Sequence, residues 1–282
     1  MTDRVAIVTG GLRGLGQAMA LGLLRSGVRV LAIGHIDSDV ADMQALLQPA
    51  EADRLACLVA DLRKPAECDR AVAACLDRFG RVDILVNSAG LTFTTIWPDR
   101  FRRDTPQKFW EAKDEIIQAV MDTNYVAADQ MTRRVAPKLV AQGWGRIVSV
   151  TTKLDTMNRP GTTPYGASKA ALEMATEVWA KELAGSGVTA NIVNPGAGAN
   201  TPGMAQEMRD WSREGKAARL VEPDEMVPPL LFVVSPAADA VNGYRFDANT
   251  WDRSLPPAEA ARRNGIPAGF VLHPQDIAAW PG

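Results

Sequence analysis

The stretch Thr9-Gly10-Gly11-Leu12-Arg13-Gly14-Leu15-Gly16 decides the fold of this chain. It follows an apolar run at 5–8 and precedes a helical pattern. A strand, a glycine turn and a helix in this order are typical of nucleotide-binding proteins. Gly10 permits the tight turn, Gly14 lets the backbone approach a pyrophosphate, and Gly16 lets the helix pack against the strand. The stretch therefore predicts a dinucleotide site at the first strand.

The rest of the chain repeats this alternation of apolar runs and amphipathic stretches. The further apolar runs lie at 28–33, 55–60, 82–86, 146–150 and 188–193. They are apolar at nearly every position, as expected for strands that are covered on both faces. The segment Gly243–Phe246 is predicted as a seventh strand, at the edge. The pattern predicts an α/β fold, a doubly wound parallel sheet of seven strands with helices on both faces.

The same pattern predicts one domain with two additions. Proline is favoured in first helical turns, and helices are expected to begin near Gly14, Asp39, Pro65, Pro106, Pro164 and Pro223. No repeat or low-complexity linker divides residues 1–282, so we expect a single domain. An insertion at 92–110 and a C-terminal extension at 249–282 exceed the alternating plan. They either shape a substrate pocket or serve as surface decoration and subunit contacts.

Composition and charge narrow the classes of partner and location. The formal net charge of -2 gives no reason to expect a nucleic-acid or anionic-membrane partner. No stretch approaches the ~20 apolar residues of a membrane span, and the first residues lack the apolar core of a signal peptide. We therefore expect a cytoplasmic protein. Cys57, Cys68 and Cys75 form no CxxC motif, so we expect them in core packing and expect no metal site.

Several motifs in order resemble the short-chain dehydrogenase/reductase family. Its TGxxxGxG fingerprint is met by the glycine turn. Three further matches follow the third, fourth and sixth predicted strands, at Asp61-Leu62, Asn87-Ser88-Ala89-Gly90 and Asn194-Pro195-Gly196. In the family these segments contact the adenine ring, form the NNAG turn and lie beside the nicotinamide. The resemblance covers nearly the whole chain and implies a Rossmann-like fold with hydride transfer between a nicotinamide cofactor and a carbonyl or alcohol carbon.

The segment Tyr165-Gly166-Ala167-Ser168-Lys169 matches the YxxxK motif of the family. Residues four apart share one face of a helix, so Tyr165 and Lys169 project toward the same site. A nearby ammonium favours the phenolate, and we therefore expect Lys169 to lower the pKa of Tyr165 from its ordinary ~10. Tyr165 then exchanges a proton with the substrate oxygen. By resemblance, Lys169 also holds the nicotinamide ribose hydroxyls.

The chain departs from the family at the serine that hydrogen-bonds the substrate oxygen. The matching residue is Thr152, which keeps the hydroxyl but adds a methyl group that stiffens and crowds the side chain. Thr151 and Ser149 are alternative donors, although strand alternation places them opposite Thr152. Asn124 matches the family asparagine that orders a water beside the lysine.

The end of the second predicted strand favours NADP(H) over NAD(H). NAD sites usually place an acidic side chain there, and this chain has Gly34 followed by His35. Arg13 lies inside the glycine turn, and a guanidinium can bind a 2′-phosphate through two hydrogen bonds. Asp37 is the alternative, and it would favour NAD(H) if the strand ended later.

The cofactor is expected to contact side chains or backbone from every motif. The predicted contacts are Gly10, Arg13, Gly14, Leu15, Gly16, His35, Asp61, Leu62, Asn87, Ala89, Gly90, Tyr165, Lys169, Pro195, Gly196, Gly198 and Thr201. Thr201 is displaced by one residue from the family threonine that contacts the nicotinamide amide. The small residues before it predict a mobile lid. Beyond it, Met204, Met208 and Trp211 either cover the substrate or belong to the core.

Together these features predict an NADP(H)-dependent oxidoreductase that acts on a small carbonyl or alcohol. A cofactor-binding sensor or scaffold without catalysis is the alternative, supported only by Thr152. A dehydratase or epimerase is disfavoured by the intact YxxxK motif. By resemblance, the helices at 106–142 and 164–183 pair in a homodimer or homotetramer. The loop aromatics Phe93, Trp97, Phe101 and Trp110 either indicate an apolar or ring-bearing substrate or serve only as folding contacts.

Overall fold

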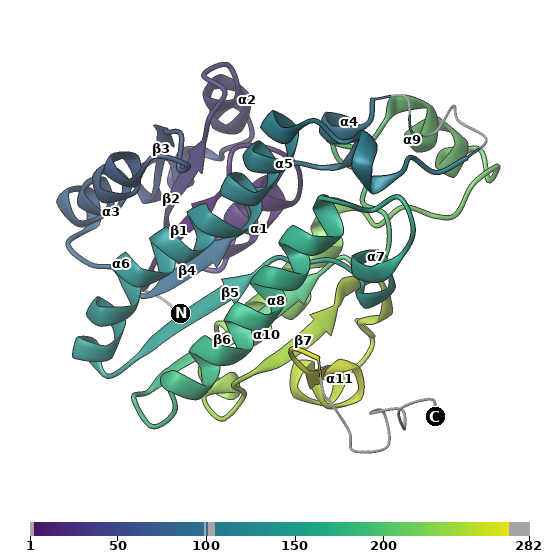
Figure 1. Cartoon of the computed structure of the whole chain (residues 1–282). Coiled ribbons are helices and arrows are strands. Elements are labelled where there is room, and N and C mark those ends of the chain that lie inside the picture. Colours follow the sequence, from purple (N-terminus) through teal and green to yellow (C-terminus); the bar gives the residue numbers. More distant parts are fainter. Residues whose placement is uncertain (1–2, 99, 101–104, 271–282) are drawn as a thin grey trace.

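The strands form one sheet in the order β3-β2-β1-β4-β5-β6-β7-β8 (Figure 1). The computed structural model describes residues 3–98, 100 and 105–270. The parallel strands are β1 (Val5–Thr9), β2 (Arg29–Gly34), β3 (Leu55–Val59), β4 (Ile84–Asn87), β5 (Gly145–Ser149), β6 (Val188–Asn194) and β7 (Tyr244–Asp247). Strand order reverses between β1 and β4, and ligands of such sheets bind beyond the carboxyl ends at this point. The predicted doubly wound parallel sheet is confirmed.

An eighth strand corrects the predicted edge of the sheet. β8 (Ile266–Pro267) pairs antiparallel with β7, so Gly243–Phe246 does not lie at the edge. Two residues that include a proline carry no strand periodicity, and the pairing depends on how the extension folds back. The extension also forms α11 (Pro257–Asn264), which packs against α10 (Val227–Val233). Residues 271–282 of the predicted extension lie outside the described residues.

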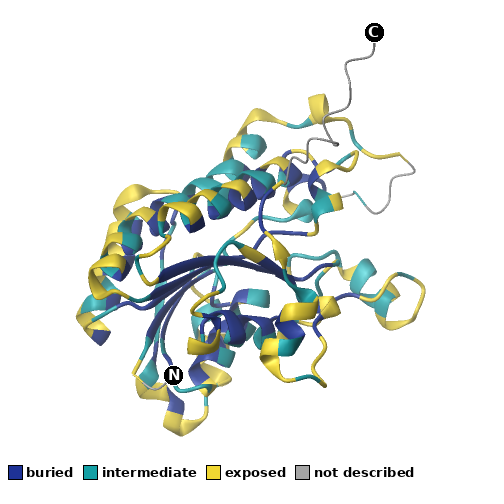
Figure 2. Cartoon of the chain, turned by 90° about the horizontal axis from the view of Figure 1, so that it is seen from below, coloured by how far each residue is buried: buried dark blue, intermediate teal, exposed yellow. Residues whose placement is uncertain are grey.

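Helices cover both faces of the sheet (Figure 1). One layer contains α3 (Pro65–Phe79), α6 (Ala127–Gln142) and α8 (Tyr165–Glu182), and the other contains α1 (Gly14–Arg25), α10 and α11. Val5 and Ile7 of β1 pack with the first layer, while Ala6 and Val8 pack with the second. Both faces of the strand are therefore apolar, which explains the nearly continuous apolar runs. Figure 2 shows the buried sheet between helices with exposed outer faces.

The predicted helix starts are confirmed with one exception. The remaining helices are α2 (Asp39–Ala45), α4 (Phe93–Ile96), α5 (Asp114–Met121), α7 (Leu154–Asn158) and α9 (Gln206–Arg213). Pro223 begins a single 3₁₀ turn before α10. The predicted start at Pro106 is wrong, because α5 begins after Lys113, whose backbone is extended. The carboxylates of Asp114 and Glu115 in its first turn complement the helix dipole.

The cysteines lie in the core, as expected. Cys68 and Cys75 lie on the buried face of α3, where burial raises the pKa of their thiols to about 11 and about 12. Cys57 on β3 is partly buried. Within the part of the chain that the structure describes, no helix combines the length and the apolar character needed to cross a membrane.

Candidate functional site

The turns after β1 and β4 are in direct contact. Gly10 has a φ of +65°, and a Cβ at this position would lie 2.9 Å from the Cα of Ala89. Thr9 Oγ1 accepts hydrogen bonds from the backbone N–H groups of Ser88 (3.0 Å) and Ala89 (3.1 Å). Thr9 therefore fixes the second turn against the first. The sequence analysis did not predict this role of Thr9. Its position as the first residue of the TGxxxGxG fingerprint is the feature that could have indicated it.

The first turn of α1 presents unpaired backbone donors. No described side chain caps this helix, and its first bond runs from Gln17 N to Arg13 O at 3.2 Å. The N–H groups of Gly14, Leu15 and Gly16 precede that bond and have no carbonyl partner within the helix. Such donors, together with the positive end of the helix dipole, suit a phosphate. The turn thus fits the pyrophosphate of a dinucleotide.

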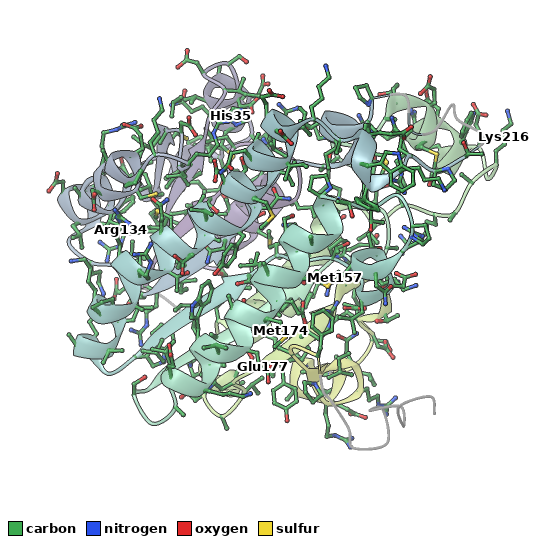
Figure 3. All side chains as sticks on the ribbon, in the orientation of Figure 1. His35, Arg134, Met157, Met174, Glu177 and Lys216 are labelled. Carbon is green, nitrogen blue, oxygen red and sulfur yellow. The ribbon has the colours of Figure 1, made fainter. Side chains whose placement is uncertain are left out.

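Packing explains why no acidic side chain ends β2. A Cβ at Gly34 would lie 2.8 Å from Leu12 Cδ1, so any larger residue would collide with the glycine turn. Beside it, Arg13 Nη1 lies 3.8 Å from Asp39 Oδ2, the longer end of the ion-pair range. His35 is exposed on the loop before α2 (Figure 3). The end of β2 beside the glycine turn therefore has a partly exposed guanidinium and no carboxylate at the strand end.

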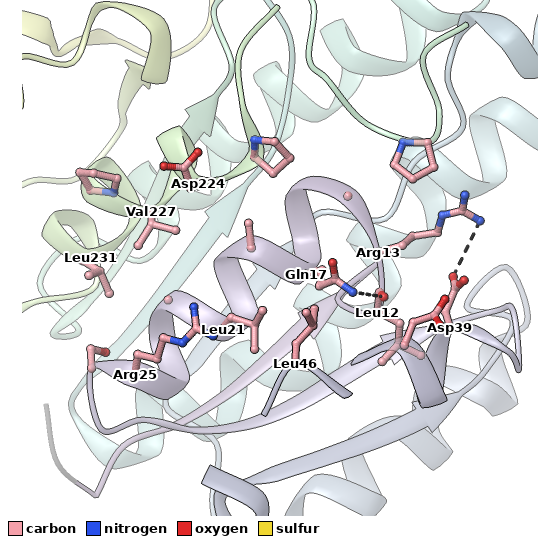
Figure 4. Close-up of a pocket in the computed structure, with 18 of the residues that line it drawn as sticks. Leu12, Arg13, Gln17, Leu21, Arg25, Asp39, Leu46, Asp224, Val227 and Leu231 are labelled. Atoms are coloured by element: carbon pink, nitrogen blue, oxygen red, sulfur yellow. Dashed lines mark hydrogen bonds and ion pairs between the residues drawn. The ribbon is translucent and has the colours of Figure 1, made fainter. Parts of the chain in front are cut away.

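A groove of ≈ 1190 Å³ runs along the outer side of α1 (Figure 4). Its lining includes Arg13, Gln17, Leu21, Asp39, Leu46, Val227 and Leu231. Arg13 and Asp39 face each other at one end of the groove. None of the four predicted catalytic residues lines it. The groove therefore borders the nucleotide turn but is separate from the predicted reaction centre.

The predicted adenine and NNAG segments are both well anchored. Asp61 accepts hydrogen bonds from Arg63 Nε at 2.8 Å and Nη2 at 2.9 Å, and these bonds lower the pKa of Asp61. Leu62 is buried beside it. Asn87 Nδ2 donates to Thr132 Oγ1 at 3.0 Å, while its buried Oδ1 has no hydrogen-bond partner. The unpaired Oδ1 leaves an acceptor at the carboxyl end of β4, beside the nucleotide turns.

Thr152 and Tyr165 meet at the carboxyl end of β5. Thr152 is buried and lies beside Tyr165 in the first turn of α8, close enough for its hydroxyl to lower the pKa of Tyr165. Burial raises the pKa of Tyr165, and the Thr152 hydroxyl opposes this with a smaller effect. The predicted lowering by Lys169 is wrong for this arrangement. Its ammonium donates to Val150 O at 2.8 Å, and it does not contribute to the pKa of Tyr165.

Lys169 and Asn124 meet around Gly90. A Cβ at Gly90 would lie 3.3 Å from both Asn124 Oδ1 and Lys169 Nζ. Asn124 is fully buried in a π-helical turn between α5 and α6, a feature that recurs at functional sites. Its Nδ2 donates to Ser168 Oγ at 3.0 Å, and its Oδ1 accepts from Leu91 N at 2.7 Å. Burial lowers the pKa of Lys169 to about 8.

The alternative hydroxyl donors are engaged away from Tyr165. Thr151 Oγ1 donates to Glu173 Oε2 at 2.9 Å, and Ser149 Oγ accepts from Thr176 Oγ1 at 2.8 Å. The placement of Thr152 opposite Thr151 stays a prediction. β5 ends at Ser149, so strand alternation does not extend to these residues. Thr152 is therefore the hydroxyl available to a substrate.

The insertion contacts Tyr165 directly. The ring of Phe93 lies 4.5 Å from that of Tyr165, and Trp97 is buried in an adjoining cluster that also touches Tyr165. Trp110 is exposed and takes no part in this cluster. Phe101 lies outside the described residues. Two of the four predicted loop aromatics thus border the reaction centre.

The loop after β6 lies over the nucleotide turn. A Cβ at Gly14 would lie 3.4 Å from Thr201 Cβ. Farther along the loop, Gly203 O accepts hydrogen bonds from Thr92 Oγ1 (2.6 Å) and Thr94 Oγ1 (2.7 Å) of the insertion. The loop therefore joins the nucleotide turn to the insertion. Its mobility stays a prediction.

The turn at the start of this loop is fixed by β6 itself. Gly196, which follows Pro195, donates its N–H to Asn194 Oδ1 at 2.8 Å. Gly198 lies farther along the same loop, and a Cβ at this position would lie 3.5 Å from the methyl of Met204.

Among described residues, no group of three or more histidine, cysteine, aspartate or glutamate side chains is placed to hold a metal.

The sequence of this chain is similar to those of known proteins. The family model described as short chain dehydrogenase matches residues 4–213. A 3-oxoacyl-[acyl-carrier-protein] reductase from Synechocystis is 32% identical over 250 residues, which cover 88% of this chain and 96% of that protein.

Two solved structures are similar in fold and carry different cofactors. A 3-ketoacyl-(acyl-carrier-protein) reductase from Brucella melitensis, complexed with NADH, has a TM-score of 0.73 and 27% identity over 87% of this chain and 96% of its own. An actinorhodin polyketide ketoreductase with NADPH has a TM-score of 0.71 and 27% identity over 85% and 93%. The similar structures therefore include both nicotinamide cofactors.

Proposed function

Because this chain belongs to the short-chain dehydrogenase family and is an NAD(P)-dependent oxidoreductase of carbonyl and alcohol groups, we propose that it prefers NADP(H) and uses Tyr165 as its acid and base. The observation that carries the proposal is the placement of Thr152 beside Tyr165, one helical turn from Lys169 and from the Asn124 side chain that meets it around Gly90. This placement puts two hydroxyl groups where one carbonyl oxygen can meet both.

The residues of the centre have distinct roles. Tyr165 gives a proton to the carbonyl oxygen during reduction and takes it back during oxidation. Thr152 donates its single hydroxyl proton to the same oxygen when the substrate is bound, and its place beside Tyr165 keeps the two hydroxyl groups on that oxygen. Asn124 and Lys169, which meet around Gly90, hold the ribose side and an ordered water. The bound nicotinamide supplies or accepts the hydride.

The nucleotide would be held mainly by backbone. The N–H groups of Gly14, Leu15 and Gly16 bind the pyrophosphate, and Arg13 binds the 2′-phosphate. The packing of Gly34 supports NADP(H), because it excludes an acidic side chain at the strand end. The remaining proposed cofactor contacts are Gly10, His35, Asp61, Leu62, Asn87, Ala89, Gly90, Tyr165, Lys169, Pro195, Gly196, Gly198 and Thr201.

We also propose how the chain is organised and assembled. It is one domain in which the insertion shapes the substrate site, as the contact of Phe93 with Tyr165 supports. Met174 and Val178 are exposed apolar side chains on the outward face of α8 (Figure 3 labels Met174), which supports pairing of this helix in a dimer or tetramer. We place the enzyme in the cytoplasm. Light scattering of the purified protein tests the assembly.

The decisive experiment is a titration of the purified chain with NADPH and, separately, with NADH. Nucleotide fluorescence and thermal shift report binding before any substrate is known. We expect tighter binding of NADPH, and a panel of ketones and aldehydes then tests turnover with Tyr165→Phe as the inactive control. Equal affinity for both nucleotides would contradict the NADP(H) preference, and binding without turnover of any carbonyl would favour the non-catalytic alternative.

A further inference from the structure

An ion pair is buried behind the proposed catalytic residues and has no part in the chemistry described above. Arg245 of β7 and Glu173 of α8 have side chains that are 1% and 0% exposed, and Arg245 Nη1 lies 2.9 Å from Glu173 Oε1. Taking both charges out of water is costly unless other polar groups offset it. Among the described residues, Arg245 Nε and Nη1 make no hydrogen bond, so the contacts of Arg245 Nη2 and of the Glu173 carboxylate identify what the pair holds.

Both members of the pair bind the segment that carries the substrate-facing hydroxyl. Arg245 Nη2 donates to the carbonyl oxygen of Thr152 at 3.0 Å. Glu173 Oε2 accepts a hydrogen bond from Thr151 Oγ1 at 2.9 Å. The ion pair therefore holds two adjacent residues, Thr151 through its side chain and Thr152 through its backbone carbonyl.

This fastening matters because the sheet does not hold the segment. The pairing of β5 with β4 and β6 ends at Ser149, and Val150 N makes a last backbone bond to Asn87 O at 2.9 Å. Thr152 lies beyond that bond. Its carbonyl therefore depends on Arg245 for a buried donor.

The C-terminal part of the chain completes the surroundings of the pair. Gly269 N lies 3.3 Å from Glu173 Oε1 and donates to it. Asp247 Oδ1 lies 3.4 Å from Arg245 Nη2 and accepts a hydrogen bond from Asn194 Nδ2 at 2.6 Å. The pair is therefore joined to the strand end that precedes the nicotinamide-side turn, and the extension contributes to its burial.

We propose that the Arg245–Glu173 pair is a positioning device that holds the Thr151–Thr152 segment, and with it the Thr152 side chain, beside Tyr165. The inference rests on the proposed function, in which both hydroxyl groups meet the substrate oxygen. Without the pair, the Thr152 carbonyl loses its donor and the segment turns until that carbonyl finds another. The Thr152 side chain then moves away from Tyr165, and the pKa of Tyr165 rises because the Thr152 hydroxyl opposes the effect of burial.

The charged groups around Tyr165 allow this effect to be isolated. Lys169 lies on the same helix, and Arg100 lies 4.2 Å from the ring centre of Phe93, which itself packs on Tyr165. Neither Lys169 nor Arg100 contacts the pair through a hydrogen bond that the described residues make. Removal of both members of the pair changes no net charge, so a change at Tyr165 would report orientation of Thr152.

Arg146 provides a matched control. Its side chain is also 1% exposed, it lies on β5, and it pairs with Asp239. It stands at the start of that strand, and Thr152 lies past the strand's other end. Arg146→Lys therefore disturbs a buried arginine of the same sheet without reaching the proposed centre.

The first test is a spectroscopic titration that needs no substrate. The chain has three tyrosines, so a Tyr125→Phe, Tyr244→Phe background leaves Tyr165 as the only phenol, and its ultraviolet absorbance reports ionisation. Into this background we would place Arg245→Met with Glu173→Met, Thr152→Val, and Arg146→Lys. Replacing both members of the pair by apolar groups leaves neither of them as a buried unpaired charge, and Asp247, which loses Arg245, keeps its hydrogen bond from Asn194. Circular dichroism would check that the variants fold.

We expect the double variant and Thr152→Val to raise the Tyr165 pKa by similar amounts, with no further rise when they are combined, and Arg146→Lys to leave it unchanged. In carbonyl reduction, the double variant should lose at least about tenfold in kcat with unchanged NADPH affinity. An unshifted Tyr165 in the double variant overturns the proposal, as does an unshifted Thr152→Val. If no carbonyl is turned over at all, the proposed function fails, and the titration still decides the role of the pair.

Discussion

The nucleotide turn and the catalytic end of this site are held together by different kinds of interaction. At the turn, backbone N–H groups of α1 and a partly exposed ion pair, Arg13 with Asp39, face the proposed cofactor. At the catalytic end, Asn124, Lys169 and Thr152 are buried and hydrogen-bonded to their neighbours. Substitution of the exposed Arg13 should therefore disturb the fold less than substitution of the buried residues at the catalytic end.

The difference also predicts what each end contributes. Exposed charges are screened by water and salt, so those at the turn adjust affinity by modest amounts. Buried groups have fixed orientations, and they act on the transition state and on the stability of the fold. Substitutions at the catalytic end should change kcat or unfolding, and substitutions at the turn should change Kd.

The largest expected effect follows from Tyr165→Phe. Removal of the phenol hydroxyl takes away the proton donor, and kcat should fall by about 10³-fold or more. NADPH binding should stay within about twofold of the parent, because general acid-base groups act mainly on the chemical step. Steady-state kinetics and a fluorescence titration check both values. Tyr244→Phe, at an exposed position, is the matched control, and equal losses in the two variants would contradict the role of Tyr165.

Lys169→Met should lower the catalytic activity and raise the free energy of unfolding. Burial lowers the pKa of Lys169 from 10.5 to about 8, so below pH 8 the folded chain carries a buried charge that disfavours folding. The unfolding free energy of the variant should exceed that of the parent by about 1–3 kcal/mol near neutral pH. The Val150 carbonyl, which loses its hydrogen bond from Lys169, reduces this gain.

The sign of the pH dependence follows from proton counts. Between about pH 8 and 10.5 the unfolded parent binds more protons at this lysine than the folded parent, so parent stability rises with pH and the advantage of the variant shrinks. Urea unfolding at several pH values measures this. Lys181→Met, on the exposed face of the same helix, should show no such trend. A constant advantage across that range would mean that the lysine is not desolvated.

Arg13→Ala tests the selectivity of the turn. Loss of a charge-assisted contact with a 2′-phosphate should weaken NADPH binding by about tenfold, and NADH binding should change by less than about twofold. Arg25→Ala is the matched control, because Arg25 lies on the same helix at the far end of the groove. Equal weakening of both nucleotides would instead assign Arg13 to the pyrophosphate.

Thr152→Ser should have the smallest effect. The substitution keeps the hydroxyl beside Tyr165 and removes only a methyl group, so kcat should stay within about threefold. Thr152→Val keeps the shape and removes the donor, and it should cost about 10²-fold. A comparison of kcat for both variants separates the methyl from the hydroxyl. A large loss in the serine variant would show that the buried methyl orients the segment.

Local patterns explain why most of the fold was predictable. The glycine turn, the apolar runs and the first-turn prolines each act within a few residues, and the corresponding elements formed where expected. The start of α5 was missed because proline at 106 competed with the acidic pair at Asp114 and Glu115. β8 was missed because its two residues take their pairing from β7, far away in the chain.

The sequence by itself determined which groups this protein can use. The turn at 10–16, the Tyr165–Lys169 spacing and Thr152 in place of serine are all consequences of local order, because helix and turn geometry place neighbouring residues together. Only the tertiary structure decided how these groups behave. Lys169 donates to Val150 O, and burial raises the pKa of Tyr165. Arg245 reached Thr152 from a strand far along the chain, since burial and long-range packing set the partners of charged groups.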